Sequence, residues 1–130
     1  MPLLDDFMKN LSHEMEMDEI IEPEMSGVYV LPLEDDLSLI ISMGDLGISL
    51  TADIADCPEI RREQFLSELL LGNLFGQGTM DAVLGLSSNG KKITLARHLD
   101  HAIEYDEFSD VLEDFMNSAI FWREEAQNFK

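Results

Sequence analysis

The sequence predicts an α+β domain whose elements follow the order α-β-β-β-α-β-β-α, with a mostly antiparallel twisted sheet flanked by helices. Three observations support this prediction. Apolar side chains recur at helical spacing near both ends of the chain, residues 28–54 alternate in the manner of strands, and Asn89-Gly90 separates two short strand-like segments. With 130 residues, the chain is expected to form one domain over residues 1–130.

Residues 2–17 predict an amphipathic first helix with acidic residues between its apolar positions. Those apolar positions are Leu4, Phe7, Met8, Leu11 and Met15. The acidic segment 18–26 contains Pro23 and is interpreted as a loop.

Residues 28–33 predict a first strand, in which Pro32 cannot donate to a ladder and therefore indicates an edge position or a bulge. Residues 37–43 and 46–54 predict a hairpin that turns at Gly44-Asp45. The second of these strands places one set of apolar residues on a single face, namely Leu46, Ile48, Leu50, Ala52 and Ile54.

Asp56-Cys57-Pro58-Glu59 has the form of a helix start, because Asp56 can cap a free N–H and Glu59 can reach back toward it. The helix that follows is expected to end near residues 73–76, and Leu71 widens its apolar stripe toward burial on all sides. The stripe itself comprises Phe65, Leu66, Leu69, Leu70 and Leu74.

Two further strands, at about 81–87 and 91–97, flank Asn89-Gly90, the pair best suited to a type I′ turn. A long last helix over about 105–126 then gives the strongest periodic signal in the chain. Its apolar positions are Phe108, Val111, Leu112, Phe115, Ala119, Trp122 and Ala126.

The net charge of −19 and the pI near 4.1 exclude nucleic acid and anionic membranes as expected partners, because both are bound through clustered Lys and Arg. No apolar run approaches the ~20 residues of a membrane span. The acidic N-terminus is unlike a signal peptide, and the single Cys57 excludes an internal disulfide. These features predict a soluble, cytoplasmic protein.

No constellation of residues predicts catalysis, so no catalytic residue, cofactor or metal is expected. His98-Leu99-Asp100-His101 contains metal-ligand types, but it is better interpreted as a polar connection. Gly76-Gln77-Gly78 follows a helix, whereas a phosphate loop precedes one. Cys57 has no histidine near it in the sequence.

Four methionines near the first helix leave two interpretations open, a core filler or an adaptable apolar surface for a partner. They are Met8, Met15, Met17 and Met25.

The segment 69–99 and the helix that carries Phe108, Phe115 and Trp122 together resemble the class I chaperones of type III secretion, the Tir-chaperone family. The resemblance covers about residues 57–125, while the first half agrees only in pattern and departs at Pro32 and at the acidic stretch 14–24. The matching positions are Leu69, Leu70, Asn73, Gly76, Gly78, Thr79, Leu84, Gly85, Leu95, Phe108, Phe115 and Trp122.

This resemblance implies a secretion-chaperone-like fold and a homodimer that binds a secreted effector near the effector's N-terminus. The effector segment would stay extended without ATP and be presented to the secretion apparatus, whose ATPase is a further implied partner. In this family the second helix contributes to the dimer interface, while the first helix and the sheet supply apolar patches for the client. An acidic interaction protein, such as a nucleic-acid mimic, remains the alternative.

Two sets of candidate residues follow. The effector-binding candidates are Leu4, Phe7, Leu11, Val28, Val30, Leu39 and Ile41, of which some must be core because strand side chains alternate. The dimer-interface candidates, chosen because the second helix is too apolar for one buried face, are Phe65, Leu69, Leu70, Leu74 and Phe75.

Overall fold

The computed structural model describes residues 3–16, 23–34, 36–45, 47–73, 82–100 and 102–128. Within these ranges the helices and strands follow the predicted order, and every strand pair is antiparallel, so the predicted fold class is confirmed. The elements are α1 (Leu3–Glu14), β1 (Val28–Glu34), β2 (Leu37–Gly44), β3 (Gly47–Asp56), α2 (Arg62–Asn73), β4 (Val83–Leu86), β5 (Lys92–Asp100) and α3 (Tyr105–Asn128).

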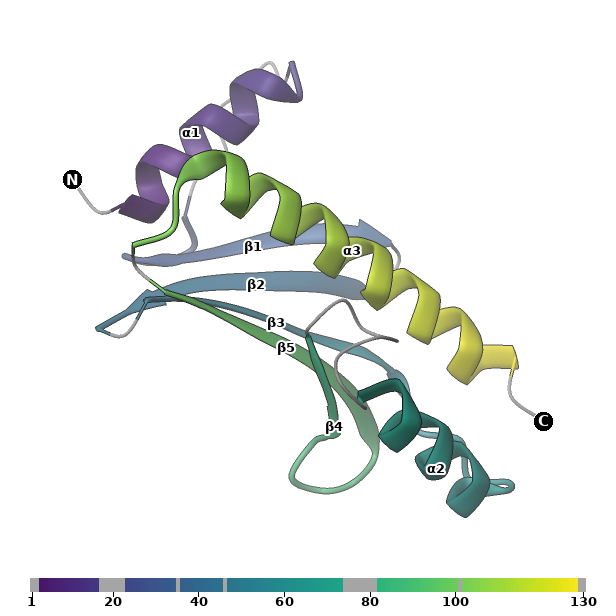
Figure 1. Ribbon diagram of the computed structural model, residues 1–130. Helices are drawn as coiled ribbons and strands as arrows, with labels where there is room; N and C mark the ends of the chain where they lie inside the picture. The colour runs from purple at the N-terminus through teal and green to yellow at the C-terminus, as the bar shows by residue number, and fades with distance from the viewer. Residues whose placement is uncertain are drawn as a thin grey trace.

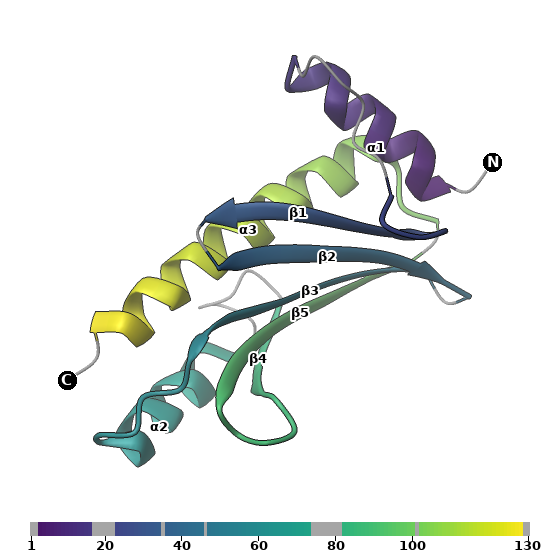
Figure 2. The same cartoon turned by 180° about the vertical axis from the view of Figure 1, so that it is seen from behind.

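The strands form one sheet in the spatial order β1-β2-β3-β5-β4. In Figure 1, α1 and α3 lie over one face of this sheet, and α2 lies beside β4 at the far end. The view from behind in Figure 2 shows the opposite face with none of these helices over it. β1 is an edge strand whose ladder is irregular between Pro32 and Glu34, which confirms the position predicted for Pro32.

Strand alternation directs one set of side chains toward α1 and α3, where the core lies. In β3 the predicted set Ile48, Leu50, Ala52 and Ile54 is buried, while Leu46 lies outside the described residues. α3 contributes the other half of the core through its apolar stripe, as its periodicity predicted. Its buried residues are Phe108, Leu112, Phe115, Ser118, Ala119, Trp122 and Ala126.

The predicted start of α2 at Asp56 is wrong. β3 continues through Asp56, which pairs with Lys92 of β5, and the amide nitrogen of Cys57 then donates to the carbonyl oxygen of Lys91 at 2.8 Å. The helix begins only after Arg61, where a positive φ of 57° changes the direction of the chain. Pairing with β5 therefore keeps Asp56 and Cys57 in the sheet, away from the first turn of α2.

The predicted type I′ turn at Asn89-Gly90 is also wrong, because that turn needs two residues with positive φ and only Gly90, at 73°, has it. The amide nitrogen of Gly90 donates to the carbonyl oxygen of Ser87 at 2.8 Å. The side-chain oxygen of Asn89 accepts from the amide of Lys91 at 2.9 Å. Asn89 thus supports the turn as a side-chain acceptor, which is its other common role in turns.

The buried side of α2 differs from the predicted stripe. Phe65, Leu69 and Gly72 face inward, whereas Leu70 is exposed. Gly72 is needed for close approach, since an added Cβ would lie 2.6 Å from the Cζ2 atom of Trp122. A glycine near the end of α2 therefore allows this helix to pack directly on the indole ring of α3.

Replacement of Gly72 by alanine should lower the free energy of unfolding by about 1–2 kcal/mol. Overpacking costs about 1–3 kcal/mol, and an approach of 2.6 Å to a ring atom corresponds to the upper part of that range, about 2–3 kcal/mol. The better helix propensity of alanine offsets ~1 kcal/mol of this cost. Urea denaturation measures the difference. Gly44→Ala is the matched control, because no atom lies within 4 Å of its added Cβ. Equal midpoints for the two variants would show that Gly72 has no packing role.

Two tyrosines contact α1, one through a hydrogen bond and the other through ring packing. The hydroxyl of Tyr29 donates to the carboxylate of Asp5 at 2.6 Å, which ties β1 to α1. Tyr105 packs against Phe7 with ring centroids 5.7 Å apart, and its hydroxyl oxygen is buried with no hydrogen-bond partner among the described residues. Burial, aided by the carboxylate of Glu14, raises the pKa of Tyr105 to about 12.

Tyr105→Phe should leave stability at neutral pH unchanged or slightly higher, because it removes a buried hydroxyl that lacks a partner. The raised pKa favours the protonated phenol in the folded state, so its stabilising contribution is complete below the ordinary value of 10.0. That contribution is lost as the pH rises through about 12, and Tyr105→Phe should abolish this part of the alkaline loss.

Urea denaturation between neutral pH and pH ~11 tests this prediction. Tyr29→Phe is the contrasting variant, and it should cost about 1.5–3 kcal/mol at neutral pH because it removes a hydrogen bond to a charged group. A neutral-pH cost for Tyr105→Phe as large as that for Tyr29→Phe would contradict the expected result.

Candidate partner-binding surfaces

α2 presents two large apolar side chains to solvent. Leu70 and Leu71 are 72% and 69% exposed, whereas Phe65 and Leu69 of the same helix are buried. Of the dimer-interface candidates, Leu70 alone is both described and exposed, while Leu74 and Phe75 lie outside the described residues. Two adjacent exposed leucines on one helix are typical of a surface that meets a partner.

Most effector-binding candidates lie in the core of this chain. Leu4, Phe7 and Leu11 of α1 are buried against α3 and the sheet, and Leu39 and Ile41 of β2 are fully buried. These side chains offer no surface to a partner in this conformation.

Val28 and Val30 of β1 are the remaining candidates, and both are half-buried. The sequence could not decide which side chains of β2 face the core, because isoleucine occurs at both odd and even positions of this strand. A shift of one residue in register would exchange its two faces. The structure places Ile40 outward, 42% exposed, between its buried neighbours.

Side chains on the sheet face opposite α1 and α3, which we call the open face, form a row across all five strands. The register places Val30 beside Ile40, Ile40 beside Thr51, Thr51 beside Ala96, and Ala96 beside Val83. We call these residues the open-face row. None carries a charge, although the chain contains 27 acidic residues. Sequence reasoning missed the row because it depends on the pairing of strands distant in sequence.

A groove of about 560 Å³ lies over the first four members of this row. Ser38 and Thr94 also line it, and Asp36 and Asp53 give it an acidic rim along one side. The floor is therefore apolar or hydroxylated, while the charge is confined to the margin.

Both edges of the sheet are partly closed to a further strand. On β4, the side-chain amide of Asn73 accepts from the N–H of Leu84 at 2.7 Å and donates to its carbonyl oxygen at 2.8 Å. On β1, the N–H of Val28 donates to the carbonyl oxygen of Met25 at 3.0 Å, and Pro32 has no N–H to offer. These contacts occupy Leu84 on β4 and Val28 on β1, so those backbone groups are not offered to a further strand.

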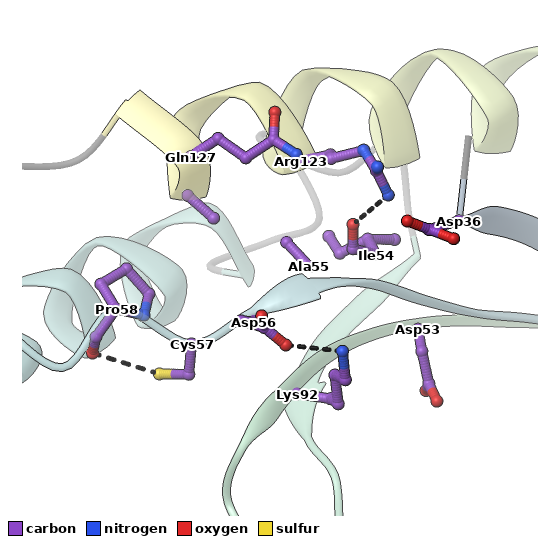
Figure 3. A pocket seen from close by; sticks show the side chains of 11 residues that line it. Asp36, Asp53, Ile54, Ala55, Asp56, Cys57, Pro58, Lys92, Arg123 and Gln127 are labelled. Atoms are coloured by element: carbon purple, nitrogen blue, oxygen red, sulfur yellow. Dashed lines mark hydrogen bonds and ion pairs between the residues drawn. The ribbon is translucent and has the colours of Figure 1, made fainter. Parts of the chain in front are cut away.

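A second pocket, of about 380 Å³, lies where the end of β3 meets α3 and the segment before α2 (Figure 3). Arg123 of α3 points toward β3, and its guanidinium donates to the carbonyl oxygen of Ile54 at 3.2 Å. It also lies 3.7 Å from the carboxylate of Glu34. These contacts join α3 to β1 and β3, which favours a structural role for the pocket.

The other polar contacts of this second pocket have no catalytic arrangement. Lys92 pairs with Asp56, and their hydrogen bond lowers the pKa of the Asp56 carboxyl and raises the pKa of the Lys92 ammonium group. Cys57 is buried, and its thiol lies 3.8 Å from the carbonyl oxygen of its neighbour Pro58. Among the residues that the structure describes, the contacts of these groups are one ion pair and one weak contact of the thiol with a carbonyl oxygen.

The motif around His98 differs from its predicted setting, because His98 and Asp100 belong to β5, while His101 lies outside the described residues. Among the described residues, no group of three His, Cys, Asp or Glu side chains could hold a metal ion. No helix in the described ranges is long and apolar enough to cross a membrane.

The methionines divide between the two interpretations. Met8 is buried in the core, whereas Met15 and Met25 are exposed, and Met17 lies outside the described residues. Gap-filling in the core therefore accounts for Met8, while Met15 follows the end of α1 and Met25 precedes β1 as exposed apolar side chains.

Comparisons with known proteins agree with this fold. A Chlamydia pneumoniae protein is 29% identical over 122 residues, which cover 92% of this chain and 93% of that protein. The crystal structure of the ExsC–ExsE complex contains a chain similar to this one with a TM-score of 0.73, at 15% identity over 97% of both chains. The structure of the Yersinia pestis type III secretion chaperone SycH with a fragment of YscM2 is also similar, with a TM-score of 0.65. The two chains are 13% identical, and the match covers 90% of this chain and 97% of that one.

The sequence also matches a family model, that of the Tir chaperone protein (CesT) family, over residues 4–123. The match includes α1 and the first strands, where the sequence itself resembled the family only in pattern. The chain therefore belongs to the Tir chaperone protein (CesT) family.

Proposed function

We propose that this protein is a non-catalytic, cytoplasmic type III secretion chaperone that acts as a homodimer. It binds an N-terminal segment of a secreted effector, keeps that segment extended without ATP, and presents it to the secretion apparatus, with the apparatus ATPase as a further partner. The observation that carries the proposal is a set of exposed apolar side chains on a strongly acidic member of the Tir chaperone family. The two structures with a similar chain, the ExsC–ExsE complex and SycH with a fragment of YscM2, each contain two different proteins.

The outer side of α2 supports the proposed homodimer. Leu70 and Leu71 expose most of their side chains on a helix whose inner side is already fixed by Phe65 and Leu69. Burial of each leucine against a second copy would contribute roughly 1.5–3 kcal/mol of apolar transfer free energy. In a two-fold dimer each contribution occurs twice, because the same patch serves on both copies.

The net charge opposes association, since two copies carry 2 × −19 = −38 charges. At physiological salt, screening restricts this repulsion to about 8 Å, so repulsion between distant acids is weak. Apolar burial at α2 can then dominate, provided that the acids lie outside the contact.

Leu70→Asp should convert the dimer to monomers, because burial of an unpaired carboxylate costs several kcal/mol. Sedimentation velocity at micromolar concentration measures the change. Met15→Asp is the matched control, since Met15 is similarly exposed but lies at the end of α1. A wild-type protein that sediments as a monomer would exclude the dimer, and a dimeric Leu70→Asp variant would exclude this side of α2 as its interface.

The client should be held chiefly by apolar burial. The chain offers acids over its whole length and apolar groups in defined places, whereas a nucleic-acid mimic must compete for many cationic contacts. Binding through apolar surface should give a negative heat-capacity change and a weak salt dependence. Binding through charge should weaken by orders of magnitude between low and moderate salt.

The test is co-purification of the protein from its native cytoplasm, identification of the bound chain, and calorimetry of the purified pair at two salt concentrations and two temperatures. We expect a secreted protein that is bound through a segment near its N-terminus, with affinity that changes little with salt. A steep salt dependence with little heat-capacity change would instead support the nucleic-acid mimic.

A further inference from the structure

We infer that the side-chain amide of Asn73 takes the place of a sixth strand at the β4 edge of the sheet, and that it keeps β4 from pairing with β4 of a second copy of the chain. Asn73 is the last residue of α2, and its partner Leu84 belongs to β4. The inference concerns association between sheets, and it does not depend on the proposed binding of a client.

The two hydrogen bonds of Asn73 reproduce the contact that a neighbouring strand would make. Its side-chain oxygen accepts from the N–H of Leu84 at 2.7 Å, and its side-chain nitrogen donates to the carbonyl oxygen of Leu84 at 2.8 Å. In an antiparallel ladder, two opposite residues exchange the same pair of N–H···O bonds. A side-chain amide has both a donor and an acceptor, so it can satisfy both backbone groups of one strand residue.

Leu84 is one of two residues in β4 whose backbone groups point away from β5. The N–H of Ser87, the residue after β4, donates to a carbonyl oxygen of β5 at 2.9 Å. Because hydrogen-bonded and non-hydrogen-bonded pairs alternate along an antiparallel ladder, the residues of β4 that direct N–H and C=O groups outward are Leu84 and Leu86. With Leu84 occupied by Asn73, the outward backbone groups that β4 can still offer to a further strand are those of Leu86.

The composition of β4 makes this edge prone to self-pairing. Its sequence, Val-Leu-Gly-Leu, carries no charge, and Val83 and Leu86 are 60% and 38% exposed. Exposed apolar edge strands pair with other chains unless they are covered, bulged or charged. A strand can pair antiparallel with its own copy across a two-fold axis, because each residue then meets the same partner on both copies. At the opposite edge, Pro32 and the irregular register of β1 already limit such pairing.

Neighbouring contacts hold the amide of Asn73 in position. Gly72, the preceding residue, lies so close to α3 that an added Cβ would be 2.6 Å from the ring of Trp122. At the other end of α2, the guanidinium of Arg62 donates to the carbonyl oxygen of Gly90 at 2.9 Å. Because both ends of α2 are fixed, the side chain of Asn73 loses little freedom when it bonds to β4.

Amide hydrogen exchange of the full-length protein, followed residue by residue by NMR, tests the contact itself. In the unmodified protein, we expect the Leu84 amide to be more protected than the Leu86 amide. Asn73→Ala should speed exchange at Leu84 by about tenfold, the change expected for the loss of one hydrogen bond. Asn89→Ala is the matched control and should leave Leu84 unchanged, because Asn89 also makes two hydrogen bonds, but within the turn after β4.

Sedimentation velocity over a range of concentrations tests the consequence. Asn73→Ala should form species larger than those of the unmodified protein, in a proportion that rises with concentration, whereas Asn89→Ala should not. A second change, Leu86→Pro, removes the other outward N–H of β4 and should restore the original size in the double variant. In a Leu70→Asp background, Asn73→Ala should still increase association, because the new contact forms through β4. Circular dichroism confirms that each variant retains the fold.

The contrary results each overturn one step of the inference. Equal protection of Leu84 and Leu86 in the unmodified protein would show that Asn73 does not close the edge, and this comparison holds even if Asn73→Ala fails to fold. Faster exchange at Leu84 without larger species would show that the closed edge is not what keeps copies apart. Larger species in Asn89→Ala as well would assign the association to lost stability. The proposed chaperone function stands in each case, because none of these measurements involves a client.

Discussion

The packing of α3 on one face of the sheet is the constraint on which the other features depend. Phe108, Phe115 and Trp122 lie along one stripe of this helix, and they belong to the same buried core as the inward side chains of β3 and β5. Loss of a buried aromatic side chain of this kind costs about 3–5 kcal/mol, so the stripe fixes which phase of each strand faces inward. Once that phase is set, the outward phase is set as well, and the open-face row is its direct consequence.

A few residues at the two ends of α2 fix its position against α3, β4 and the hairpin between β4 and β5. Gly72 lets α2 approach the ring of Trp122, and Asn73, the next residue, pairs with the backbone of Leu84. Arg62 at the other end of α2 donates to the carbonyl oxygen of Gly90 in the hairpin at 2.9 Å. With both ends of α2 held in this way, Leu70 and Leu71 have no inward position available and face solvent.

The distribution of charge complements this arrangement of apolar surface. Acidic residues such as Asp110, Glu113 and Asp114 cover the outer side of α3, while the open-face row and the outer leucines of α2 are uncharged. High net charge keeps a protein with exposed apolar groups dispersed, because like charges repel before the apolar groups meet.

The sequence by itself determined the order of the elements, the inward set of β3 and the apolar stripe of α3, because each is a local repeat with a clear period. It did not determine the start of α2, since the pairing of Asp56 with Lys92 joins residues far apart in the chain. Nor could the sequence separate core residues from surface residues among the binding candidates. Leu39, Ile40 and Ile41 are similarly apolar, and only the packing of the sheet decides which face each one occupies. The tertiary structure alone decided the open-face row, because its members lie on five strands and become neighbours only through the register of the sheet.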